Sequence, residues 1–218
     1  MFGLPKTTEF NKKIPKHKFY EKLDVTPELK RVFIDNIKVI YWVNKLAAST
    51  TNLAIGKTVT EIEFFEISLS KEPLDISALR LMDRQITYHI IFILEYKGRY
   101  QVWTAYKEAV TSGNKAFNVG SNFHSDWCEP SNLIFRLEGL DLDTVYENLV
   151  RSIAGDGLRK PEGKDETLKE SVERQNLRQN LQKQIEKLQK KIFKEKQINK
   201  QFELSNQLKK LQRQLDST

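Results

Sequence analysis

The positions of glycine and proline constrain this chain more than any other feature. All nine glycines and all six prolines lie at or before Gly163, so neither residue type interrupts the stretch from 164 to 218. Because these are the residues that most often end helices, this stretch is predicted to be helical. We therefore expect a folded domain over residues 1–154, a linker over 155–165 and a helical tail over 166–218.

The charge of the chain divides at the same place. Residues 1–165 carry 23 Lys and Arg against 22 Asp and Glu, whereas residues 166–218 carry 13 against 7. Most of the net charge of +7 therefore belongs to the tail. A basic helix is either a solvated surface or a contact for an acidic partner such as nucleic acid, and both interpretations stay open here.

Cysteine content and apolar runs predict a cytoplasmic protein. The single cysteine, Cys128, cannot form an internal disulfide, and the first residues lack the apolar segment of a secretory signal. The longest apolar runs, 39–43 and 90–94, are too short to cross a membrane. Structural zinc needs four grouped Cys and His ligands, which the sequence does not offer, so we expect neither a metal nor a cofactor.

The first part of the chain predicts an α+β domain. Thr26, Asp75 and Asp141 can cap helices over 26–36, 75–82 and 141–154. Alternating apolar or β-branched residues predict strands over 39–46, 60–69, 88–94, 99–107, 117–123 and 133–137. Lys97 and Gly98 mark a tight turn that should join two antiparallel strands. This order predicts a mainly antiparallel sheet with helices on one face.

Two apolar seams run along the tail, and each steps by four, three and four residues, which is the spacing of a coiled coil. The seam residues are Leu181, Ile185, Leu188 and Ile192, then Leu204, Leu208, Leu211 and Leu215. The two frames are out of register, so the tail is either one long helix or a hairpin that turns near 195–201, and the equal length of the two seams favours the hairpin. We expect these residues to bind one another, a second copy of the chain or a partner protein.

Catalytic motifs of high specificity do not occur in the sequence: it has no phosphate loop, dinucleotide fingerprint, nucleophile elbow or paired-histidine metal motif. Asp83, Glu95 and Lys97 follow the Asp…Glu-x-Lys order of metal-dependent nucleases, in which carboxylates hold Mg²⁺ and a lysine helps to activate water. A solvated turn is the simpler explanation of Glu95 and Lys97, because Gly98 follows directly.

Three weaker candidates have simple structural explanations. Glu61, Glu63 and Glu66 are expected to be charges on a strand surface rather than metal ligands. His124 and Cys128 place a base near a thiol, but such residues in a loop are more often structural. Lys45, Arg84 and Lys107 could line a polar site near strand ends, although most such residues merely cover a surface.

The N-terminal segment 11–22 interleaves lysines with aromatic residues. Lysines neutralise phosphates and aromatic rings stack on bases, so this arm is a candidate nucleic-acid contact. An exposed arm that only improves solubility would have the same composition. The candidate residues are Lys12, Lys13, Lys16, Lys18, Phe19 and Tyr20.

Several short segments together resemble a known family. They are Phe2-Gly-Leu-Pro5, Asn11-Lys-Lys-Ile-Pro15, Glu61-Ile-Glu-Phe-Phe-Glu-Ile67, Ile91-Phe-Ile-Leu94 with Ala105-Tyr-Lys107, and Leu140 to Val150. Over nearly its whole length the chain is similar to a bacterial and archaeal family of domains of unknown function with a domain-plus-coiled-coil layout. The resemblance implies genes beside helicases and site-specific DNA methyltransferases in restriction or phage-defence clusters, and it assigns no catalytic residues.

We therefore expect a non-enzymatic accessory subunit of a DNA-acting defence or restriction complex, which binds partner proteins through the α+β domain and the coiled coil. The expected partners are helicase or methyltransferase subunits, or a second copy of the chain. No binding to a membrane is expected. Two alternatives remain. One is a metal-dependent nuclease that uses Asp83, Glu95 and Lys97, and the other is a nucleic-acid-binding protein that acts through the basic arm and tail.

Overall fold

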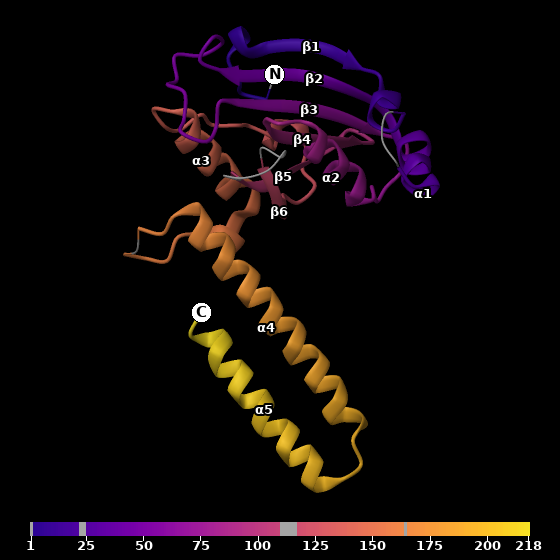
Figure 1. Cartoon of the computed structure of the whole chain (residues 1–218), viewed down its shortest axis with the longest axis vertical. Helices are drawn as coiled ribbons and strands as arrows, with labels where there is room; N and C mark the ends of the chain where they lie inside the picture. The colour runs from indigo at the N-terminus through magenta and orange to yellow at the C-terminus, as the bar shows by residue number, and fades with distance from the viewer. Residues whose placement is uncertain (1, 22–24, 110–116, 164) are drawn as a thin grey trace. The chain divides into compact units, whose positions relative to one another are not determined.

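The computed structural model describes residues 2–21, 25–109, 117–163 and 165–218 (Figure 1). The chain divides into two compact units, which comprise residues 1–155 and 156–218. Each unit has its own secondary structure.

A six-stranded mixed sheet with the order β1-β2-β3-β4-β5-β6 forms the centre of the first unit. Neighbouring strands are antiparallel except β3 and β4, which are parallel because helix α2 connects them. The strands are β1 (Glu9–Ile14), β2 (Ile37–Ala47), β3 (Glu61–Leu69), β4 (His89–Tyr96), β5 (Arg99–Ala109) and β6 (Phe117–His124). The predicted hairpin of β4 and β5 is confirmed, and Lys97 and Gly98 in its turn both have positive φ.

The three predicted helices of this unit are confirmed, and each begins at its predicted cap. Thr26 accepts a hydrogen bond from Leu29 N, Asp75 from Ser77 N, and Asp141 from Thr144 N. The helices are α1 (Pro27–Arg31), continued by the π-helical turn η3 (Val32–Asn36), α2 (Ile76–Gln85) and α3 (Leu142–Ala154). Short 3₁₀ turns are η1 (Lys6–Thr8), η2 (Lys16–Phe19), η4 (Pro130–Asn132) and η5 (Gly155–Leu158). Among the described residues, every helix is too short or too polar to cross a membrane.

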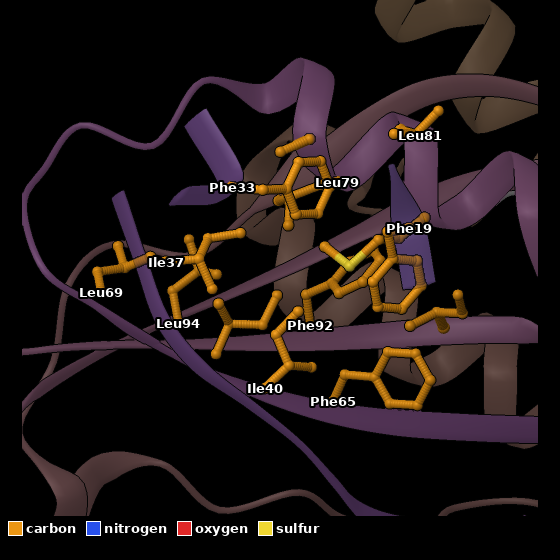
Figure 2. Packing of buried hydrophobic residues seen from close by; sticks show 14 residues of the cluster. Phe19, Phe33, Ile37, Ile40, Phe65, Leu69, Leu79, Leu81, Phe92 and Leu94 are labelled. Atoms are coloured by element: carbon orange, nitrogen blue, oxygen red, sulfur yellow. The ribbon is translucent and has the colours of Figure 1, made fainter. Parts of the chain in front are cut away.

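Helices cover both faces of the sheet, so the prediction of a single covered face is wrong. Phe92 of β4 belongs to the same buried cluster as Leu79 and Met82 of α2 (Figure 2). The ring of His89, which is on the opposite face of β4, contacts that of Tyr146 in α3, with centroids 4.3 Å apart. The parallel crossover places α2 on one face, and the apolar side of α3 covers the other.

Two segments differ from their predicted structure. Residues 9–14, expected to be part of a free arm, form the exposed edge strand β1, which pairs with β2. Residues 133–137, expected to be a strand, have no regular structure. Leu133 and Phe135 are buried, and Phe135 N donates a hydrogen bond to Phe2 O. The alternation in this segment therefore reflects burial rather than strand pairing.

The second unit contains helices α4 (Leu168–Lys194) and α5 (Ile198–Asp216), which lie side by side as an antiparallel hairpin (Figure 1). The tail therefore turns back, and the alternative of one long helix is wrong. Leu181 and Ile185 are buried, and the other six seam residues are half-buried. The two seams thus cover each other within one chain.

Polar side chains make the turn of the hairpin without glycine or proline. Glu195 Oε1 accepts hydrogen bonds from the backbone N of Lys196 and of Gln197, both at 2.9 Å. Gln201 Nε2 donates to Glu195 O at 2.7 Å. The backbone groups that two helix ends leave free therefore find partners, and the N–H groups of Gln197 and Lys196 lower the pKa of Glu195.

Candidate functional site

The three residues of the nuclease hypothesis do not come together. Asp83 lies in α2 near the start of β4 and is 2% exposed, whereas Glu95 and Lys97 lie at the far end of β4. A strand of this length separates the two ends by roughly 20 Å. Glu95 Oε1 accepts a hydrogen bond from Gly98 N at 3.0 Å, so these residues form a hairpin turn. The structure offers no shared metal site for this set.

Asp83 instead forms a buried ion pair with Lys107 of β5. Lys107 Nζ lies 3.0 Å from Asp83 Oδ1, and both side chains are 1% exposed. The same ammonium group donates hydrogen bonds to the carbonyl oxygens of Asp83, Ile86 and Tyr88. Burial raises the pKa of Asp83 to about 6 and lowers that of Lys107, while their mutual attraction opposes both shifts. Lys107 thus links the end of α2 to strand β5 of the sheet through these contacts.

A second charged cluster lies where β2 meets β3. Lys45 Nζ is 2.7 Å from Glu61 Oε2, and Lys45 lies opposite Glu63 in the strand register. Glu63 is only 2% exposed, so the expectation of a surface charge is wrong for this residue. Burial raises the pKa of Glu63 to about 8, with Lys45 opposing the shift and the charge of Glu61 adding to it. Glu63 is therefore largely protonated at neutral pH.

The same cluster offers only two carboxyl groups to a cation. Across residues 2–21, 25–109, 117–163 and 165–218, no three acidic, His or Cys side chains group closely enough to hold a metal ion. Lys45 already supplies a positive charge next to Glu61. In this cluster, folding favours the protonated form of Glu63. The stability of the protein should therefore depend on pH.

Replacing Glu63 by glutamine should change how stability depends on pH. The pKa of Glu63 rises from 4.5 to about 8 on folding, so the native protein loses stability as the pH rises through that interval. The E63Q variant lacks this titrating group and should not lose stability in this way. Its free energy of unfolding, relative to that of the native chain, should therefore increase by about 2–4 kcal/mol from pH 5 to pH 8. Urea unfolding at both pH values measures the gain. The exposed Glu138→Gln change is the control, and an equal effect of E63Q at both pH values contradicts the assignment.

His124 and Cys128 do not form a catalytic pair. The ring of His124 stacks on Trp103, with centroids 4.4 Å apart. Cys128 lines a cavity of about 570 Å³ together with Val102, which is on the opposite face of β5 from Trp103. Burial raises the pKa of the Cys128 thiol, which disfavours the thiolate that a nucleophile needs.

The N-terminal arm keeps only part of its predicted nucleic-acid surface. Lys16 Nζ donates to Ile37 O at 2.6 Å, and Phe19 is 6% exposed, with its ring stacked on Phe33. Tyr20 is half-buried beside the same Phe33 ring. Phe19 belongs to the core and is not available to stack on a base, and Tyr20 packs against the core with part of its ring covered. The lysines of this set that remain exposed are Lys12, Lys13 and Lys18.

A shallow basic groove runs along one flank of the hairpin. Two hollows of about 520 Å³ each lie between α4 and α5, and both are lined by Lys191 and Gln207. Two acidic residues, Glu195 and Glu203, contribute to the lining. The lysines of this basic groove are Lys187, Lys190, Lys191, Lys194, Lys200 and Lys210. Within the described hairpin, these six lysines form no ion pair.

Three large apolar side chains are exposed near the turn of the hairpin. Phe193 is 91% exposed, Ile198 80% and Phe202 69%, and none of them lines the basic groove. Large apolar side chains exposed at one end of a hairpin are candidate contact sites for other molecules. We call these three residues the apolar tip. The hairpin thus presents a basic groove and, close to some of its lysines in the sequence, an apolar tip.

Comparison with known proteins gives one family. The family model that matches is described as "Domain of unknown function (DUF4391)", and the match covers residues 2–215. It therefore includes the sheet and almost all of the hairpin. No curated protein and no solved structure matches the chain.

Proposed function

The chain belongs to the DUF4391 family of domains of unknown function, and we propose that it is a non-enzymatic accessory subunit of a DNA-acting complex, docked on a partner protein through its apolar tip. The observation that carries the proposal is the exposure of Phe193, Ile198 and Phe202 at one end of the hairpin. The resemblance found in the sequence supplies the setting, because it implies genes beside helicases and site-specific DNA methyltransferases in restriction or phage-defence clusters.

The seams of the hairpin leave the apolar tip as its best remaining contact surface. Ile185 in α4 is 4% exposed, because the apolar side chains of α4 and α5 cover each other. A seam that is already covered gains little by binding another helix. In this proposal the partner protein therefore binds the three tip residues rather than the eight seam residues.

The surroundings of the apolar tip indicate the chemistry of the partner. Phe193 lies between Lys191 and Lys194 in the sequence, and Ile198 lies between Lys196 and Lys200. A partner surface that accepts this tip would offer an apolar pocket with an acidic rim, since complementary charge speeds association and excludes other partners.

The first unit supports a binding role more than a catalytic one. Its two buried charged clusters serve the fold, because Lys107 fastens α2 to the sheet and Glu63 carries a proton at neutral pH. The thiol of Cys128 has a raised pKa, to which burial and the charge of Glu129 contribute, and the ring of His124 stacks on Trp103. Glu63 and Asp83 are buried away from external substrates, and the raised pKa of Cys128 disfavours its thiolate.

Replacing the apolar tip should release the partner. The triple variant Phe193→Ser, Ile198→Ser and Phe202→Ser, made in the full chain, should weaken binding to the helicase or methyltransferase encoded beside this gene by at least about 100-fold, because exposed aromatic anchors carry most of the energy of such contacts. Light scattering after size-exclusion chromatography of the mixed proteins measures the complex.

The matched control is Leu177→Ser, which changes an exposed apolar residue of α4 outside the tip. This control should still co-elute with the partner. Co-elution of the triple variant at the native ratio would rule out docking through the tip, and so would a native chain that binds none of the neighbouring gene products.

A further inference from the structure

The basic groove is a second surface of the hairpin with chemistry of its own. It gathers six lysines against two glutamates, of which Glu195 is attracted by Lys200, and in the described hairpin no carboxylate lies within ion-pair distance of any of the six. Unpaired ammonium groups in a shared depression produce a positive potential that attracts a polyanion. We propose that the basic groove binds the phosphodiester backbone of a DNA strand.

The lysines form two rows that flank the groove. Lys187, Lys191 and Lys194 follow one side of α4 at steps of four and three, and Lys200 and Lys210 lie on α5. At about 1.5 Å per residue, the α5 row extends roughly 15 Å. Along the axis of a DNA duplex each strand advances about 3.4 Å per phosphate, so this length spans about four phosphates of one duplex strand.

The remaining groove residues suit a sugar–phosphate chain. Gln184, Gln207 and Gln214 line the groove, and their amide groups can donate hydrogen bonds to phosphate and accept them from other polar groups. Such contacts hold the backbone and read no base sequence. The groove therefore predicts binding that is sensitive to salt and indifferent to sequence.

An anionic membrane is a less suitable ligand for this surface. Membrane-surface helices present lysines around an apolar face that enters the lipid. Here the exposed apolar side chains, Phe193, Ile198 and Phe202, lie outside the groove, and the leucines of the groove are half-buried in the seam. The tip residues do not line the groove, so the serine variant of the tip should leave the lysines that would bind DNA in place.

Fluorescence anisotropy of the full chain with labelled DNA tests the groove. With about four phosphates neutralised, raising the salt from 50 to 200 mM should weaken binding about 50-fold for a single strand and about 150-fold for a duplex. Two oligonucleotides of unrelated sequence should bind alike. The two arms, single-stranded and double-stranded DNA, identify which form supplies the strand.

Removing lysines from one row should reduce both the affinity and its dependence on salt. The triple variant Lys187→Gln, Lys191→Gln and Lys194→Gln should weaken binding at least tenfold at 100 mM salt, and should lower the slope of log affinity against log salt by about two to three, since each lysine accounts for about one. Circular dichroism should show unchanged helix content, because these side chains are exposed or lie at the rim of the groove.

The matched control removes equal charge elsewhere on the hairpin. Arg178, Lys209 and Arg213 are exposed and lie outside the groove, so their combined change to glutamine should leave the affinity within about twofold. The serine variant of the apolar tip should also keep DNA binding. That result separates failure of the groove from failure of the proposed docking.

Three outcomes would overturn the proposal. The first is equal weakening by the groove and control variants, which would mean diffuse attraction by the net charge. The second is no binding to either DNA at 50 mM salt. The third is binding to phosphatidylserine vesicles in preference to DNA, together with its loss in the tip variant, which would assign the surface to a membrane.

Discussion

Replacing Lys107 by methionine should lower the free energy of unfolding by about 3–5 kcal/mol. The change leaves the carboxylate of Asp83 buried without its ion-pair partner. It also removes the donor for the carbonyl oxygens of Ile86 and Tyr88 at the end of α2. Unpaired polar groups in a low-dielectric interior are costly, and methionine matches lysine in length without restoring any of these contacts.

Urea unfolding of the full chain, monitored by the fluorescence of the tryptophans of the first unit, measures this effect. The control is Lys38→Met, which removes an exposed lysine of β2 and should change stability by less than about 0.5 kcal/mol. Asp83→Asn should cost less than Lys107→Met, because Lys107 keeps its carbonyl acceptors. Equal stability of the Lys107→Met variant and the native chain would show that the pair is not buried.

The double variant Ile185→Asp and Leu208→Asp should unfold the helical hairpin. Both substitutions place a carboxylate in the apolar seam between α4 and α5, where it has no cationic partner in the seam. Single helices of this polar composition are marginal in water, so loss of the seam removes the main support of both. The far-ultraviolet circular dichroism should lose the helical signal of α4 and α5.

The matched control places aspartate at Gln182 and Gln212, which are exposed on the same two helices. This control should retain nearly full helicity, since it changes the charge equally and leaves the seam intact. The urea transition of the sheet should be unchanged in both variants. A double seam variant with native helicity would show that the seams do not hold the helices together.

Local signals in the sequence were sufficient for most of the helices and strands. Asp75 and Asp141 cap their helices through hydrogen bonds that span only two or three residues, so the sequence alone predicts them. The turn at Lys97 and Gly98 is local in the same sense. The tail could be predicted as helical from its lack of glycine and proline, and the matching seams favoured the hairpin.

Long-range pairing was the part that the sequence did not reveal. The segment Glu9–Ile14 is a strand because it pairs with β2. Its own sequence indicates only a lysine-rich arm. The segment 133–137 alternates like a strand but finds no partner in the sheet. Pairing depends on which strands meet in space, and periodicity records only which side chains are covered.

The burial of two charged residues in the sheet could not be predicted from the sequence for a similar reason. Glu63 and Lys107 lie in strands and were expected at the surface, but both are buried against partners from other elements. A charge is tolerated inside only where such partners converge, which no spacing along the chain records. The basic groove left a clearer signal, since Lys187, Lys191 and Lys194 repeat the spacing of the adjacent seam.

The exposed edge strand β1 has a consequence for aggregation. The free side of an edge strand offers unpaired N–H and carbonyl groups, to which a strand of another molecule can add. Lys12 and Lys13 lie next to each other in β1 and are both exposed. Two identical edges that approach in register would bring these positive charges together, which disfavours their pairing. The lysines of β1 therefore protect the chain against polymerisation through its sheet.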